Sequence, residues 1–238
     1  PGCTRTPATL LRSLLGASAA EPREHRRRLL AVLGASQALG DFLVAHPEHL
    51  TALAPARAWD APEEPEAREA MRNTVREALA AGTSQNRGID YSSASIESAA
   101  PGSAVDRATA ALRRVYRDRL TAIVADDVTD SGPIEHVPTV CRRMTELAGA
   151  ALDAALLIAR AAVGPQADEV ILVVIAMGKT GAYELNYISD VDVVYVVGPA
   201  REPRGMGEPN EEHLVDVGTH LATELAHVVS ATAPEPPL

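Results

Sequence analysis

The sequence has few aromatic residues, two cysteines and no long apolar run. Phe, Trp and Tyr make up only 3% of 238 residues, so Ala, Leu, Val and Ile must build the core, which suits closely packed helices. Cys3 and Cys141 lie far apart and in no metal-ligand spacing, which indicates a reduced compartment and a cytoplasmic protein. No apolar stretch reaches the roughly 18 residues of a membrane span, so we expect no membrane segment. Without an initiator Met, the chain is expected to begin inside a longer polypeptide.

Positive charge is also scarce. The sequence holds 22 Lys and Arg against 32 Asp and Glu, for a net charge of −10. This balance argues against a protein that binds nucleic acid through a broad basic surface. It is compatible with an enzyme that handles phosphate groups with a metal ion, because a bound cation reverses the local charge.

The spacing of apolar residues predicts an α+β protein in which a helical region, residues 1–163, precedes a domain that contains the strands, residues 164–238. A loop rich in Ser, Gly and Asn interrupts the helical pattern at 83–103. His46-Pro47 should end the first helix, and Ser103 is a good N-cap for the third. The predicted helices cover residues 29–43, 63–82, 105–123 and 137–156.

Several charged residues are interpreted as surface groups. The run Arg23–Arg28, "REHRRR", is typical of a solvated helix face, with docking to an acidic partner as the alternative. Asp126 and Asp127 are expected in a loop. Three histidines spaced seven apart should share one surface face of a later helix; they are His213, His220 and His227.

The two predicted strands lie in the second domain, residues 164–238. Glu169–Met177 and Val191–Val197 are continuous β-branched runs, which predicts two strands with both faces covered. Between them, Thr180–Tyr187 has the composition of a short helix. A longer amphipathic helix should begin near Asn210.

Two aspartates, Asp190 and Asp192, stand at the start of the second apolar run. Alternation along a strand would send both to the same side, where their charges repel unless a cation lies between them. Mg²⁺ prefers such oxygen ligands, typically one or two carboxylates together with substrate phosphates. The pair therefore suits phosphoryl or nucleotidyl transfer, although D-x-D alone is also frequent at ordinary strand starts.

The residues before this pair strengthen the phosphate interpretation. Gly178-Lys179 follows the first strand directly, so a glycine turn and the start of a short helix would face an anion with backbone N–H groups. Ten residues, Thr180–Ser189, then lead to Asp190. The segment matches neither the P-loop nor the dinucleotide-binding glycine pattern.

This segment resembles the DNA-polymerase-β-like nucleotidyltransferases, in which a hydrophobic-Gly-Gly/Ser turn is followed by D-x-D in a strand. More closely, it resembles the glutamine synthetase adenylyltransferase/adenylyl-removing enzymes, marked by M-G-K-x-G-x-x-E-L-N-[YF]-x-S-D-[VI]-D-[VIL]. Residues Leu33–Leu50 also resemble the N-terminal helical region of that family. The motif positions present are Met177, Gly178, Lys179, Gly181, Glu184, Leu185, Asn186, Tyr187, Ser189, Asp190 and Asp192.

The resemblance implies a polymerase-β-like nucleotidyltransferase domain and specific site residues. Asp190 and Asp192 would be the catalytic metal ligands, binding Mg²⁺ (or Mn²⁺). The residues implied to lie against the nucleotide phosphates are Gly178, Lys179, Gly181 and Ser189. The implied partners are glutamine synthetase, ADP or ATP, phosphate and a PII-type nitrogen signalling protein, without nucleic acid or membrane.

The resemblance also implies a direction of reaction. In that family a first domain removes AMP from a tyrosine of glutamine synthetase by phosphorolysis, which yields ADP, and a second domain adds AMP from ATP. The first domain usually reads E-L-N and the second E-L-G, so Glu184-Leu185-Asn186 favours deadenylylation.

The chain departs from the family pattern at two motif positions and at its end. Thr180 stands where Leu or Cys is commoner, and Tyr183 where Arg is commoner, which removes a basic phosphate contact. The family's third carboxylate comes from a later strand, which we expect to lie beyond Leu238. The metal site of this chain is therefore expected to be incomplete, as in a truncated fragment.

Three alternatives stay open at this point. The chain could belong to an AMP-adding nucleotidyltransferase of the same fold, or to one that acts on a small molecule or an RNA end. It could also be a catalytically incomplete helical module that docks glutamine synthetase. Lys179, Glu184 and Ser189 could also have no role in the site and simply be solvated or strand-capping residues.

Overall fold

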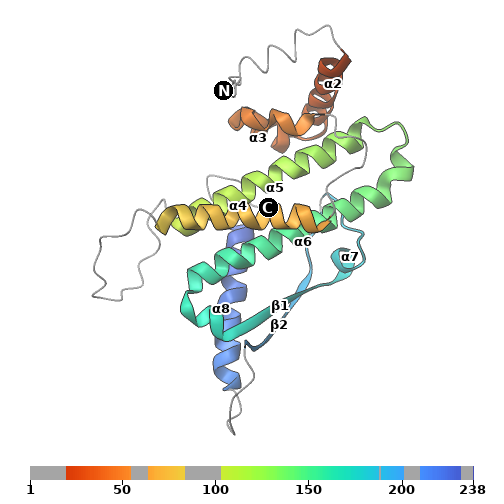
Figure 1. Cartoon of the computed structure of the whole chain (residues 1–238). Helices are drawn as coiled ribbons and strands as arrows, with labels where there is room; N and C mark the ends of the chain where they lie inside the picture. The colour runs from red at the N-terminus through yellow and green to blue at the C-terminus, as the bar shows by residue number, and fades with distance from the viewer. Residues whose placement is uncertain (1–19, 55–63, 84–102, 188, 201–209, 232–237) are drawn as a thin grey trace. The chain divides into compact units, whose positions relative to one another are not determined.

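The computed structural model describes residues 20–54, 64–83, 103–187, 189–200, 210–231 and 238 (Figure 1). The described part is mostly helical with one small sheet, in agreement with the predicted α+β class. It forms two compact units: unit 1 combines residues up to 63 with 117–144, and unit 2 combines 64–116 with 145–238. The predicted boundary at residue 163 stays a prediction. Of the loop predicted at 83–103, residues 84–102 lie outside the described residues, as does Cys3.

Unit 1 is an all-helical unit with an aliphatic core. Leu29, Val32 and Phe42 are among its buried residues, packed with the later part of α5. Its elements are α2 (Ala20–Ala35), α3 (Gln37–Ala45), the 3₁₀ helix η1 (Pro47–Leu53), the second half of α5 (Ala104–Thr129) and the start of α6 (Pro133–Val163).

The first predicted helix is divided in two by a capping serine. Ser36 has an extended backbone, and its hydroxyl accepts a hydrogen bond from Leu39 N at 3.3 Å, which begins α3. The predicted end is confirmed, because α3 stops at Ala45 and Pro47 opens the next turn.

Two expectations for charged residues of unit 1 are wrong. Asp126 lies inside α5 rather than in a loop, and Arg28 is only 5% exposed rather than solvated. Arg28 Nη2 lies 2.6 Å from Asp126 Oδ1, and Arg143 Nη1 lies 2.7 Å from Asp126 Oδ2. Arg28 Nε also donates to Leu53 O at 3.0 Å. Arg28 and Asp126, which the sequence suggests are surface residues, thus neutralise each other inside the unit.

Unit 2 contains the sheet and the helices that pack on it. Ser103 caps α5 as predicted: its hydroxyl accepts from Asp106 N at 3.1 Å, and Asp106 Oδ2 accepts from Ser103 N at 3.3 Å. The other elements are α4 (Glu64–Thr83), the 3₁₀ helix η2 (Pro165–Glu169), β1 (Val170–Ala176), α7 (Gly178–Gly181), β2 (Val193–Pro199) and α8 (Glu211–Ser230).

The sheet consists of β1 and β2, paired antiparallel with Ala176 opposite Val193. The predicted strands are confirmed, but the expectation that both faces are covered is wrong. One face packs on α8, where Val197 Cγ2 lies so close to Gly218 that a Cβ there would stand 2.7 Å away. Burial on this sheet raises the pKa of the Tyr195 phenol. The residues of the other face are 44–48% exposed; they are Ile171, Val173, Ile175, Val194 and Val196.

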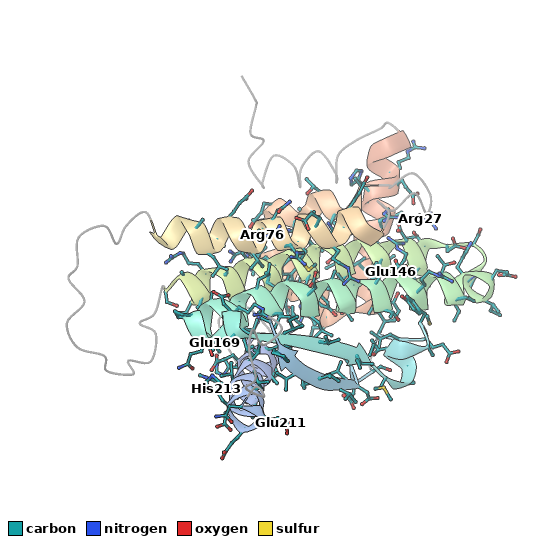
Figure 2. All side chains as sticks on the ribbon, turned by 60° about the horizontal axis from the view of Figure 1, so that its bottom comes forward. Arg27, Arg76, Glu146, Glu169, Glu211 and His213 are labelled. Carbon is teal, nitrogen blue, oxygen red and sulfur yellow. The ribbon has the colours of Figure 1, made fainter. Side chains whose placement is uncertain are left out.

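The long helix after β2 begins where the sequence indicates. Asn210 caps α8 by accepting from His213 N at 3.3 Å. His213 Nε2 lies 2.9 Å from Glu169 Oε2 (Figure 2), while His220 and His227 are exposed, as predicted for surface groups. In the part of the chain that the structure describes, no helix combines the length and apolarity that a bilayer span requires.

Replacing Arg113 with Met is expected to lower the unfolding free energy of unit 2 by about 2 to 3 kcal/mol. Arg113 is 1% exposed, and its Nη2 donates to Val228 O at 2.7 Å and to Ala231 O at 2.8 Å. Methionine keeps the apolar stem but removes the donor of these carbonyls at the end of α8. Hydrogen exchange of the α8 amides measures the change.

The exposed Arg76→Met substitution on α4 is the matched control. Its partner Glu69 is also at the surface, so the same measurement should change by under about 1 kcal/mol. Equal losses in the two variants would contradict a capping role for Arg113.

Candidate functional site

The loop between β1 and β2 begins with a turn in which two glycine positions have no room for a side chain. Gly178 has φ +52°, and a Cβ on it would lie 2.9 Å from Asp192 Oδ2. A Cβ on Gly181 would lie 2.7 Å from Ala176 O. Both glycines are therefore required by geometry, and the first lets the backbone approach the carboxylate of Asp192.

The predicted helix over 180–187 is wrong in position and length. The structure has a single helical turn, α7, that starts at Gly178 itself. It ends because Tyr183 adopts φ +61°, a left-handed conformation that costs a non-glycine residue about 1 kcal/mol or more. Glu184 N then donates to Lys179 O at 2.8 Å, which folds the segment back over the turn.

Asp192 of the acidic pair lies against this turn. Met177 N donates to Asp192 O at 2.8 Å, so the backbone of the Asp192 segment continues alongside the end of β1. The expectation that the pair lies within the strand is wrong, because β2 begins at Val193. Asp190 and Asp192 are both exposed, and neither carboxylate forms an ion pair with another described side chain.

Lys179 and Ser189 meet across the same loop. Lys179 Nζ donates to Ser189 Oγ at 3.0 Å, and the Ser189 hydroxyl donates to Asn186 Oδ1. All six predicted site residues therefore belong to one loop, with an exposed ammonium group, a hydroxyl and two exposed carboxylates.

Leu185 is a residue of this loop whose importance the sequence reasoning missed. It is 3% exposed, and its N–H donates to Thr145 Oγ1 on α6 at 3.4 Å. This hydrogen bond links the middle of the loop to the long helix α6 of the same unit. An isolated leucine in a polar segment was the available signal, since a lone apolar residue there favours an anchor.

The donor set of the acidic pair suits a divalent metal ion. Two exposed carboxylates offer hard oxygen ligands, and Mg²⁺ takes one or two such groups together with substrate phosphates. Within the described ranges, no group of three acidic, His or Cys side chains is placed to hold a metal. The chain thus supplies two candidate ligands, and substrate oxygens or further residues would complete the shell.

The turn in contact with Asp192, two residues from the exposed Asp190, agrees with the arrangement expected of an enzyme that transfers nucleotidyl groups. The family model described as glutamate-ammonia ligase adenylyltransferase matches residues 26–238. The chain belongs to this family of adenylyltransferases. Glutamate-ammonia ligase is another name for glutamine synthetase.

Curated relatives agree with this assignment. A Bifidobacterium longum subsp. infantis protein is 37% identical over 204 residues, which cover 85% of this chain and 17% of the relative. A Mycolicibacterium smegmatis protein is 41% identical over 177 residues, covering 73% of this chain and 15% of the relative. Both are named bifunctional glutamine synthetase adenylyltransferase/adenylyl-removing enzyme. The chain thus spans under a fifth of their length, and no solved structure matches it.

Proposed function

We propose that this chain carries the deadenylylating site of a bifunctional glutamine synthetase adenylyltransferase. The site would remove AMP from a tyrosine of adenylylated glutamine synthetase by phosphorolysis and release ADP. The partners proposed with it are glutamine synthetase, nucleotide, phosphate and a PII-type nitrogen signalling protein in the cytoplasm.

The observation that carries the proposal is the contact of the Gly178 turn with Asp192. It brings a segment that suits phosphate binding beside the candidate metal ligands, in a chain whose family acts on glutamine synthetase. The Glu184-Leu185-Asn186 triplet, which resembles the adenylyl-removing domain, selects the direction.

The proposed reaction exchanges one phosphorus–oxygen bond for another. An oxygen of inorganic phosphate attacks the adenylyl phosphorus, the bond to the tyrosine oxygen breaks, and that oxygen takes a proton from solvent. Asp190 and Asp192 would hold Mg²⁺ or Mn²⁺, which when bound supplies charge neutralisation at the phosphate oxygens. Lys179, held at 3.0 Å by Ser189, would place a positive charge near the incoming phosphate.

The products of the reaction test this proposal. The whole protein that carries these residues is incubated with adenylylated glutamine synthetase, Mg²⁺ and inorganic phosphate, and nucleotides are separated by chromatography. We expect ADP to appear only when phosphate is present. A matched incubation with unmodified glutamine synthetase and ATP tests for AMP addition and pyrophosphate release.

Each alternative predicts a different result. AMP addition that is lost with Asp192→Asn, with no phosphate-dependent ADP, would assign these residues to the adding reaction. Binding of glutamine synthetase without either product, unchanged by Asp192→Asn, would make the chain a docking module. Either result would overturn deadenylylation at this site.

A further inference from the structure

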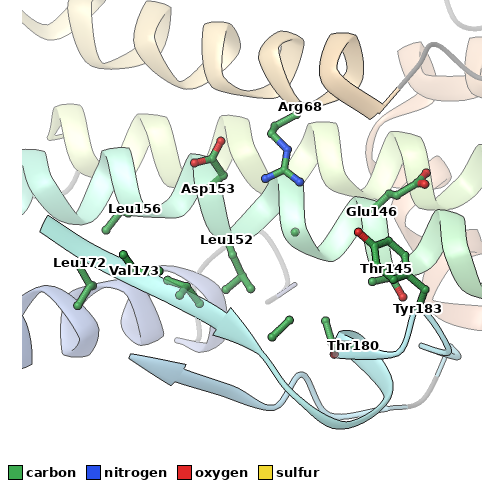
Figure 3. Close-up of a pocket in the computed structure, with 14 residues that line it drawn as sticks. Arg68, Thr145, Glu146, Leu152, Asp153, Leu156, Leu172, Val173, Thr180 and Tyr183 are labelled. Atoms are coloured by element: carbon green, nitrogen blue, oxygen red, sulfur yellow. The ribbon is translucent and has the colours of Figure 1, made fainter. Parts of the chain in front are cut away.

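The two faces of the β1–β2 sheet differ in what covers them. α8 packs on the face that carries Val197, and Leu172 lies opposite Val197 in the register and shares that face. A cavity of about 480 Å³, lined by Leu172 together with Leu152 and Leu156 of α6, lies between this face and α6 (Figure 3). The opposite face carries apolar side chains that stay about half exposed.

Four residues of this open face form an apolar strip next to the candidate site. Each is 44–47% exposed and none lines the cavity; they are Ile175, Met177, Val194 and Val196. Ile175 lies opposite Val194 in the register, so their side chains are neighbours on one face. Val173, opposite Val196, also borders the cavity and is not counted in the strip.

The backbone register places Asp192 at one end of the apolar strip. Met177 N donates to Asp192 O at 2.8 Å, which continues the β1–β2 pairing one residue pair past the end of the strands. Because successive side chains along a strand point to opposite faces, Asp192 shares the open face with Val194 and Val196. The carboxylate of the candidate site and the apolar strip therefore belong to one continuous surface.

The size and chemistry of the apolar strip limit what can lie on it. From Asp192 to Val196 it extends about 13 Å, at about 3.3 Å per strand residue, and its four side chains have no charged, hydroxyl or amide group. A nucleoside laid along it would lose the hydration of its polar groups without gaining partners. A second copy would need roughly 20 to 30 residues a side for a stable interface. The strip therefore fits a short polypeptide segment with apolar side chains.

We propose that the apolar strip receives the segment of glutamine synthetase that carries the adenylylated tyrosine. This rests on the proposed function, which makes that tyrosine the substrate beside Asp192. In an extended segment, residues within about four positions of the tyrosine span the strip, and alternate ones point toward Val194 and Val196. Apolar side chains at those alternate positions bind the protein substrate, and they do not contribute to binding of phosphate.

Steady-state kinetics of the whole protein that carries these residues test the strip. The double substitution Val194→Thr and Val196→Thr replaces one methyl of each side chain by a hydroxyl at nearly constant shape. We expect it to raise the KM for adenylylated glutamine synthetase about tenfold, while kcat and the KM for phosphate stay within about twofold. Val194→Ile with Val196→Ile keeps the strip apolar and should retain the wild-type KM. Val215→Thr, at an exposed valine of α8, is the matched control.

Binding without turnover separates this inference from the proposed reaction. Without phosphate, the affinity for adenylylated glutamine synthetase is measured by biolayer interferometry, and the Ile175 δ1 methyl signal is followed by NMR with a soluble paramagnetic agent. We expect the double Thr variant to bind about tenfold more weakly, and glutamine synthetase to protect the Ile175 methyl of the unaltered protein from the agent. If the wild type releases no ADP but both effects appear, the strip still docks glutamine synthetase and only the proposed reaction fails.

Three outcomes would overturn the inference. ADP release by the wild type with an unchanged KM in the double Thr variant would keep the reaction and remove the strip from it. A lower kcat with an unchanged KM would limit the strip to a role in the fold of the loop. Protection of the Ile175 methyl before glutamine synthetase is added would assign the strip to another part of the whole protein or to a second copy, which sedimentation velocity distinguishes. The methyl measurement uses the unaltered protein, so it decides the question if the double variant does not fold.

Discussion

Replacing Asp192 with Asn is expected to lower the rate of ADP release from adenylylated glutamine synthetase by about 100-fold or more, and Asp190→Asn by a similar factor. The amide keeps the shape of the side chain but removes the negative charge with which the proposed site would bind a cation. Because the carboxylate of Asp192 lies against Gly178, its loss also changes the charge directly beside the turn. The assay follows ADP by chromatography under saturating phosphate.

The charge lost at the site has to be distinguished from charge lost elsewhere. Asp216→Asn, at an exposed position of α8, makes the same chemical change away from the loop and should leave the rate within about twofold. Raising Mg²⁺ should recover part of the activity of the Asp192 variant, since weakened metal binding is countered by mass action. An unchanged rate in both Asp190→Asn and Asp192→Asn would show that these carboxylates do not take part in the reaction.

The glycine turn shows how far local sequence reasoning reaches. Gly178 could be identified from the sequence as a close-approach position, and its observed close neighbour is Asp192 of the same loop; the crowding of Gly181 against Ala176 O was not predicted. The first strand, the Ser103 cap and the start of the last helix near Asn210 followed in the same way from local rules. The roles assigned to the six site residues stay predictions.

The errors arise where residues distant in sequence decide the outcome. Arg28 and Asp126 are 98 positions apart, and nothing in the run "REHRRR" distinguishes the buried arginine from its solvated neighbours. The exposed face of the sheet is a similar case, because a β-branched run indicates a strand without showing how many layers cover it. The turn at Tyr183 is the third case. Its left-handed backbone is held by a loop whose anchor, Leu185, reaches a helix 40 positions earlier.

Replacing Asp126 with Asn is expected to destabilise unit 1 by about 3 to 5 kcal/mol. The side chains of Asp126 and Arg28 are only 12% and 6% exposed, and Arg143 is 15% exposed. Removing the shared carboxylate charge leaves two arginine cations close together in a largely buried region, where, among the described residues, Leu53 O still accepts from Arg28. Hydrogen exchange of the α2 and α3 amides measures the loss. The exposed Asp41→Asn, on α3, should change it by under about 0.5 kcal/mol.

A triple variant separates the cost of unpaired charge from the loss of packing. Arg28→Met, Asp126→Leu and Arg143→Met together remove all three charges while keeping similar side-chain volumes. If unpaired charge is the cause, the triple variant should regain most of the stability that Asp126→Asn loses, because apolar replacement of a buried ion group is often neutral or stabilising. A triple variant as unstable as the single one would instead assign the loss to the shape of this site. The ion group would then contribute through geometry, with Arg28 linking α2 to Leu53 at the end of η1.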